Sequence, residues 1–217
     1  MRHALTSADG AALAGAAAAV LLSVSAYLLG RQPGVRSPSQ DRQWYADSGN
    51  RFTVLLALNL APLGVVAFLW FMAVIRRRLG EHEDRFFATV FLGSGFAFAV
   101  LTLAASVAAA APTLVVWAGG SATPDQTTIG LAHGLWFGLW QVSASRLVGV
   151  FMAATSTVGR RFGAFPHWLS TFGIVVGGVL GLTGAFVGPF DFLFPLWLLV
   201  VSITLFAKRR RQSERGP

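Results

Sequence analysis

The feature that most constrains this chain is the separation of its charged residues from its apolar ones. Runs of roughly 17–25 residues without a charge alternate with short segments rich in arginine. A helix of about 20 apolar residues spans a hydrocarbon layer about 30 Å thick. The runs are apolar on all sides, whereas a helix at the surface of a soluble protein keeps one polar face. The pattern therefore predicts an all-α protein, a polytopic bundle of transmembrane helices.

Composition supports this fold class and excludes several functions. Hydrophobic residues make up 54% of the chain and charged residues 12%, against about a quarter charged in a soluble domain. The net charge is +8, and most of the basic residues that produce it lie at the ends of the apolar runs. Basic residues at such positions orient a membrane protein and contact lipid headgroups. We therefore expect the lipid bilayer, and no nucleic acid, as a partner. The chain has no cysteine, which excludes thiolate chemistry and disulfides.

The apolar runs predict about six spans within a single membrane domain, residues 1–217. The expected spans are residues 11–29, 52–75, 86–111, 130–158, 167–187 and 190–207. The first run has an alternative interpretation as a cleaved secretory signal, but its length exceeds the 7–15 residues of a usual signal core and favours a retained span. In the polar loop that follows, Trp44 and Tyr45 are expected at the headgroup interface.

The distribution of basic residues predicts that both termini are cytoplasmic. With six spans, twelve of the 17 basic residues lie on the side of the termini and four on the other side. Lys and Arg accumulate in cytoplasmic loops. The side chains expected to contact anionic lipid headgroups are Arg76, Arg77, Arg78, Lys208, Arg209, Arg210 and Arg211.

Arg146 is the most unusual residue because it interrupts an apolar span. An arginine at the centre of a span costs about 2.5–3.5 kcal/mol on insertion scales, so it is paired, hydrated or functional. At 100° per residue it lies within about 40–80° of a stripe formed by Gly138, Val142 and Gly149, which points it into the bundle. The nearest carboxylate is Asp191, at the outer end of the last span. A structural ion pair and a path for a solute both remain open.

Three other polar residues are candidates for a ligand site or a polar path. Asn59 lies in the second span, and Gln141 lies in the same span as Arg146. His133 lies nearer the outer surface among aromatic residues, which is more typical of an interface residue than of a ligand.

Two spans carry glycines at every fourth position, which lets helix backbones approach closely where lipid supplies no hydrophobic drive for association. These glycines are Gly130, Gly134 and Gly138 in the fourth span and Gly173, Gly177 and Gly181 in the fifth. We expect Gly130, Gly134 and Gly138 to pack against the fifth span near Gly177 and Gly181. The role is helix packing, within the chain or between chains.

No catalytic residue, metal site or cofactor is expected. His82 stands among acidic residues in the loop 76–85, but a solvated, charge-balanced turn explains these residues, and no second histidine stands at a ligand spacing. No nucleophile with a partner base and no carboxylate pair lies within the spans.

Three stretches carry a resemblance: RFTVLLALNLAPLGVVAFLWFMAVIRRRLGEHEDRFFATVFLGSG, SRLVGVFMAATSTVGRRFGAFPHWLSTFG and FPLWLLVVSI. They resemble a group of actinobacterial six-span integral membrane proteins of unknown function and of about this length. The resemblance implies a multi-pass protein of the bacterial cytoplasmic (inner) membrane and carries no activity.

Two functions from different classes follow. The first is a non-catalytic partner-binding or scaffold subunit, assembled as a homo-oligomer or with a membrane partner through the glycine stripes. The alternative is a small oligomeric transporter or channel for an anionic or polar solute, with Arg146 facing a cavity. A scaffold predicts that polar groups satisfy one another in a dry core, whereas transport predicts that they meet water.

Overall fold

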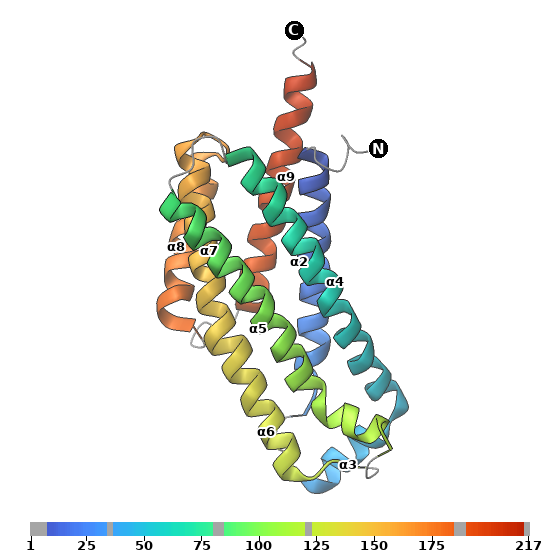
Figure 1. Ribbon diagram of the computed structural model, residues 1–217. Helices are drawn as coiled ribbons and strands as arrows, with labels where there is room; N and C mark the ends of the chain where they lie inside the picture. Colours follow the sequence, from blue (N-terminus) through green and yellow to red (C-terminus); the bar gives the residue numbers. More distant parts are fainter. Residues whose placement is uncertain (1–7, 34–36, 80–84, 120–122, 185–189, 215–217) are drawn as a thin grey trace.

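The computed structural model describes residues 8–33, 37–79, 85–119, 123–184 and 190–214, and within these ranges it contains helices and no strand. The helices form one elongated bundle (Figure 1). In chain order they are α2 (Ala8–Gly30), α3 (Pro38–Ala46), α4 (Ser48–Leu79), α5 (Arg85–Trp117), α6 (Gln126–Trp136), the π-helix η1 (Phe137–Ala144), α7 (Ser145–Arg161), α8 (His167–Thr183) and α9 (Phe190–Glu214). The all-α prediction is thereby confirmed for the described residues.

Four helices are long and apolar enough to cross a membrane, as judged by length and composition. They are Ala12–Gly30, Ser48–Arg77, Ala88–Trp117 and the continuous helix Gln126–Arg161, which joins α6, η1 and α7. Two shorter apolar helices follow, His167–Thr183 and Phe192–Ala207. Each of the six expected spans overlaps an apolar helix in the described residues, and four of these helices meet the length criterion.

The bundle has two ends of different construction (Figure 1). We call the end with the last turns of α4 and α7 the basic end, because exposed Arg76, Arg77, Arg160 and Arg161 lie there. At the opposite end, the α3 end, α3 lies across the tips of the longer helices. The 36 residues of Gln126–Arg161 extend about 54 Å, whereas the 17 residues of α8 extend about 26 Å. Figure 1 shows α8 beside α7 and not beside α6.

A cluster of aromatic side chains fills the centre of the bundle. Phe68 of α4, Phe98 of α5, Phe151 of α7 and Phe194 of α9 are each at most 2% exposed. Their rings meet edge to face, with centroids 5.4 Å apart for Phe68 and Phe98 and 5.1 Å apart for Phe98 and Phe194. Such pairs contribute about 0.5–1.5 kcal/mol each beyond buried area. Close packing of this kind holds helices together in lipid, where burial alone supplies little drive.

Most hydroxyl groups inside the apolar helices bond to their own helix. Thr102, Thr155 and Ser202 each donate to the carbonyl four residues earlier, at 2.7–2.8 Å. One hydroxyl joins two helices, since Ser25 of α2 donates to the Ala57 carbonyl of α4 at 2.8 Å. Bonding within the helix satisfies a polar group in a dry environment without a partner helix or water.

A close backbone approach between α7 and α8 corrects the predicted glycine pairing. A Cβ atom at Gly149 would lie 2.5 Å from the Gly177 carbonyl oxygen, and one at Gly177 would lie 2.5 Å from the Gly149 carbonyl oxygen. The fourth and fifth spans do pack closely, but the prediction that Gly134 and Gly138 provide the contact is wrong. Both have open space where a Cβ would stand, because α8 is too short to reach α6.

The other glycines of these two stripes differ in their surroundings. Gly173 is buried in α8, where an added Cβ would meet Ser156 of α7 and lie 2.6 Å from Trp197 Nε1 of α9. Gly181 has open space at its own Cβ position, although its backbone nitrogen faces Gly149. Gly130 is half-buried in α6. The close-packed stripe of α8 therefore consists of Gly173 and Gly177, and its main partner in α7 is Gly149.

The contact predicts opposite effects for two glycine-to-alanine substitutions. Gly178→Ala, at an exposed position of α8 with open space, is expected to leave the melting temperature unchanged or raise it, since alanine is the better helix former by about 1 kcal/mol. Gly149→Ala is expected to lower it, because overpacking costs about 1–3 kcal/mol. Thermal unfolding in detergent, followed by tryptophan fluorescence, measures both. Equal melting temperatures would contradict the close contact.

Candidate functional site

Arg146 lies at the start of α7, where this helix meets the end of α8. Its side chain is half-buried, and Nη1 donates to the Val142 carbonyl oxygen at 2.5 Å. The guanidinium group rests against Gly184, the residue that ends α8 with φ +53°, where a Cβ would lie 2.6 Å from Nη1. The C-terminal end of a helix carries partial negative charge, so this position favours a cation. The side chain of Asp191, the carboxylate expected nearest, lies outside the described residues.

The π-helix η1 precedes Arg146 and changes the direction of the side chains that follow it. Its hydrogen bonds close over five residues, and the Ser143 hydroxyl donates to the Gly138 carbonyl at 2.9 Å across the same interval. Successive side chains are rotated by 100° only in a regular α-helix, so the angle expected between Gly138 and Arg146 does not apply here. Gly138 and Gly149 lie on different surfaces: Gly138 faces open space and Gly149 faces α8.

The residues expected along a polar path have different surroundings in the described structure. Asn59 is exposed on α4, and its side-chain amide donates to the Leu55 carbonyl of its own helix at 2.8 Å. Gln141 is half-buried within η1. The two cavities described below are lined by other residues than Asn59, Gln141 and Arg146.

The fourth candidate, His133, belongs to a different part of the molecule. It is exposed on α6, its ring centroid lies 5.7 Å from that of Trp136, and it lines a small cavity at the α3 end. Within the described ranges, no group of three His, Cys, Asp or Glu side chains has the arrangement of a metal site.

The cavity at the α3 end depends on how α3 is held. The Asp47 carboxylate accepts hydrogen bonds from the backbone N–H of Gly49 at 2.7 Å and of Asn50 at 3.1 Å, which turns the chain from α3 into α4. Arg51 Nη1 then donates to the carbonyl oxygens of Tyr45 at 2.5 Å and Ala46 at 2.8 Å. A cation at the last carbonyls stabilises the C-terminus of a short helix. These bonds direct one face of α3 into the bundle.

That inner face carries a buried carboxylate that the sequence did not single out. Asp41 is 2% exposed, and its Oδ2 accepts a hydrogen bond from Gln126 Nε2 at 2.7 Å. The two residues are 85 positions apart, so the bond ties α3 to the first turn of α6. Asp41 Oδ1 is buried and has no partner among the described groups. A buried carboxylate oxygen without a partner is costly, which makes Asp41 a functional candidate.

Tyr45 lies one turn after Asp41, and its position corrects a prediction. Instead of facing lipid headgroups, Tyr45 is 1% exposed, and its ring packs edge-on against the half-buried Trp44 at 4.9 Å between centroids. Burial, and secondly the charge on Asp41, raise the pKa of Tyr45 to about 12. Trp44 and Tyr45 in a polar loop are typical of residues that anchor a chain at the headgroup interface. The packing of α3 determines that Tyr45 is the one buried in the bundle.

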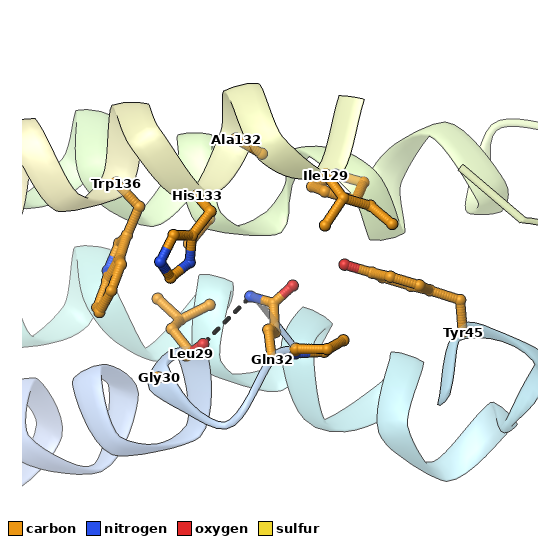
Figure 2. A pocket seen from close by; sticks show the side chains of 11 residues that line it. Leu29, Gly30, Gln32, Tyr45, Ile129, Ala132, His133 and Trp136 are labelled. Atoms are coloured by element: carbon orange, nitrogen blue, oxygen red, sulfur yellow. Dashed lines mark hydrogen bonds between the residues drawn. The ribbon is translucent and has the colours of Figure 1, made fainter. Parts of the chain in front are cut away.

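Figure 2 shows the cavity that Tyr45 lines. The Tyr45 hydroxyl points toward the side-chain amide of Gln32, and His133 and Trp136 lie at the other side. Gln32 Oε1 is buried without a partner in the described structure, and Nε2 donates to the Leu29 carbonyl at 3.4 Å. A volume of about 30 Å³ accommodates one or two water molecules. Pockets for organic ligands are about ten times larger.

The fold is a helical bundle whose four long apolar helices suggest a membrane-embedded protein. It has an aromatic centre, an arginine that rests on the end of α8 and a polar cap at the α3 end. No family model matches the chain, and neither a curated protein nor a solved structure matches it. The resemblance to actinobacterial membrane proteins therefore remains an expectation from the sequence, and the functional proposal depends on the geometry.

The buried phenol predicts a specific alkaline titration. The chain has two tyrosines, so Tyr27→Phe leaves Tyr45 as the only phenol that absorbs on ionisation. We expect its midpoint near pH 12, and we expect Asp41→Asn to lower it while leaving it above 10.0, because burial is the larger cause of the shift. Ultraviolet absorbance measures the midpoint, with circular dichroism as the control for unfolding. A midpoint near 10 before the Asp41 change would show that Tyr45 is solvated.

The sign of the accompanying stability change follows from the same shift. The folded protein favours the neutral phenol, so its contribution to the free energy of unfolding is fully present below pH 10.0 and is lost as the pH rises toward about 12.

Proposed function

We propose that this protein is a non-catalytic integral membrane protein that serves as a partner-binding or scaffold subunit. The observation that carries this proposal is the dry centre of the bundle. A solute path between α4, α5, α7 and α9 would have to pass Phe68, Phe98, Phe151 and Phe194, which are each at most 2% exposed and in mutual contact. The hydroxyl groups of Thr102, Thr155 and Ser202 bond to their own helices. Ser156 Oγ, Ser170 Oγ and Trp197 Nε1 are buried without a partner in the described structure.

The proposal includes six spans, with α8 and α9 as the fifth and sixth, and both termini in the cytoplasm of a bacterium. The start of α2 and the end of α9 lie at the same end of the bundle as the last turns of α4 and α7 (Figure 1). The exposed arginines of the basic end are there as well, and basic residues favour the cytoplasmic side of the inner membrane. The roughly 26 Å of α8 is shorter than the hydrocarbon layer, a mismatch that local thinning of the bilayer accommodates.

Within this proposal Arg146 has a structural role. Its guanidinium group connects the start of α7 to the residue that ends α8, through packing on Gly184 and a hydrogen bond to the Val142 carbonyl. A cation at that point is stabilised by the end of α8. This arrangement offers a reason to keep an arginine in an apolar span without a solute.

The partner surface in this proposal is the face of α6 that α8 leaves uncovered. Gly134 is exposed, Gly138 has open space at its Cβ position, and Leu131 and Leu135 beside them are 64% and 49% exposed. Glycines four residues apart let a second helix approach to backbone contact in lipid. We assign this face to a helix of a second copy of the chain.

Thiol accessibility separates the scaffold proposal from transport. Because the chain has no cysteine, single cysteines at Asn59, Gln141 and Arg146 report without background. In sealed, oriented vesicles we expect a membrane-impermeant thiol reagent to leave all three unlabelled. Position 59 would face lipid on the outside of α4, and positions 141 and 146, which are half-buried among helices, would have no path to water. Ser39→Cys, at an exposed position of α3, is the positive control from the outer side. Labelling of positions 141 and 146 from one side would instead indicate a hydrated cavity and a transporter or channel for an anionic or polar solute.

Disulfide cross-linking tests the proposed α6 surface. Gly134→Cys is expected to form a covalent dimer in membranes under mild oxidation, because the two copies would meet at this residue. Gly178→Cys, at an equally exposed glycine on α8, is the matched control and is expected to remain monomeric. Dimers from both variants would indicate random collision, and dimers from neither would exclude a second copy at this face. Gel electrophoresis without reductant distinguishes these results.

A further inference from the structure

A second cavity lies at the basic end of the bundle, between α4 and α5. It is an open groove of about 500 Å³, and its walls are mainly apolar side chains, including Leu69 and Ala73 of α4 and Phe96 of α5. Phe96 is 53% exposed, and the neighbouring Trp70 of α4 is 46% exposed. Apolar side chains exposed at this depth face the acyl chains of the bilayer. The groove is thus large enough for part of a lipid acyl chain, and its apolar walls match the polarity of that chain.

Two arginines close the groove toward the cytoplasmic surface. Arg76 and Arg77 line it and are exposed, and in the sequence they directly follow Ile75, where the apolar run of α4 ends. The end of an apolar helix lies at the level of the lipid phosphates. A guanidinium group binds phosphate through paired, charge-assisted hydrogen bonds, so the charge of this rim is complementary to an anionic headgroup.

If Arg76 and Arg77 served only to orient the protein in the membrane, their charge would be explained but the apolar groove beside them would not. Basic residues at the C-terminus of a helix interact favourably with the partial negative charge there, and they orient the helix end toward the cytoplasm. Neither effect requires a groove beside them. Arg160 and Arg161 end α7 in the same way and are exposed, but they line neither of the two cavities. The combination of an apolar groove with two arginines at its rim distinguishes the α4–α5 position.

We propose that this groove is a binding site for one anionic phospholipid. One acyl chain lies along Leu69, Ala73 and Phe96, and the phosphate lies between Arg76 and Arg77. A zwitterionic phospholipid has the same acyl chains but no net charge, so the arginines add less to its binding and it occupies the groove more weakly. The bound lipid would hold the cytoplasmic ends of α4 and α5 together. This inference does not depend on whether the protein is a scaffold or a transporter.

Native mass spectrometry of the full-length protein in detergent tests the site with dioleoyl phosphatidylglycerol and dioleoyl phosphatidylcholine as probes. We expect one tightly bound phosphatidylglycerol and much weaker retention of phosphatidylcholine. The double substitution Arg76→Gln with Arg77→Gln is expected to weaken phosphatidylglycerol binding about 30-fold, taking about 5-fold for each arginine near an anionic lipid. Arg160→Gln with Arg161→Gln removes the same charge at the same end and is expected to change the affinity by less than about 3-fold.

A second pair of variants tests the groove while keeping the arginines. Ala73→Trp fills the groove and is expected to lower the affinity for both lipids, whereas Ala104→Trp, at an exposed position of α5 outside the groove, is expected to change neither. Melting temperatures confirm that the variants are folded. Equal binding of the two lipids by the unmodified protein, or equal losses in the two arginine pairs, would overturn the proposal in favour of non-specific attraction to a basic surface.

Discussion

The backbone contact between Gly149 and Gly177 is the interaction on which the arrangement of the second half of the bundle depends. In lipid, helices gain little from burying apolar surface, so they associate where their backbones come closest. This contact sets the register of α8 against α7. Because α8 has 17 residues, the register brings its end, at Gly184, to the guanidinium group of Arg146. The same register leaves the glycine face of α6 uncovered.

The charged groups described above lie away from the aromatic centre, which itself contains the unpartnered polar atoms Ser156 Oγ and Trp197 Nε1. The centre is closed by aromatic rings from four helices. The α3 end contains a buried carboxylate, a phenol of raised pKa and a cavity of water size. The basic end combines exposed arginines with an apolar groove. In the scaffold proposal, a protein built this way presents its surfaces to lipids and to other helices.

The α3 end shows how much of a site the sequence could reveal. Pro33 and Pro38 in the polar loop argue against a helix there, but Pro38 occupies the first turn of α3 instead. Within α3, the spacing of Asp41 and Tyr45 places both on one helical face. What that face meets was not predictable, since Gln126 is 85 residues from Asp41. The loop composition favoured a headgroup interface for Tyr45, and long-range packing of α3 onto α6 buried it instead.

The sequence by itself determined the helical fold and the positions of the apolar helices. In lipid every backbone polar group must be hydrogen-bonded within the protein, and an apolar run of about 20 residues achieves this as a helix. Tertiary structure alone decided which glycines meet, where Arg146 lies and which polar groups share a cavity. These depend on the ends of neighbouring helices and on the π-helix η1, which breaks the regular 100° rotation between Gly138 and Gly149. Such relations belong to pairs of helices, and the pattern within one helix does not specify them.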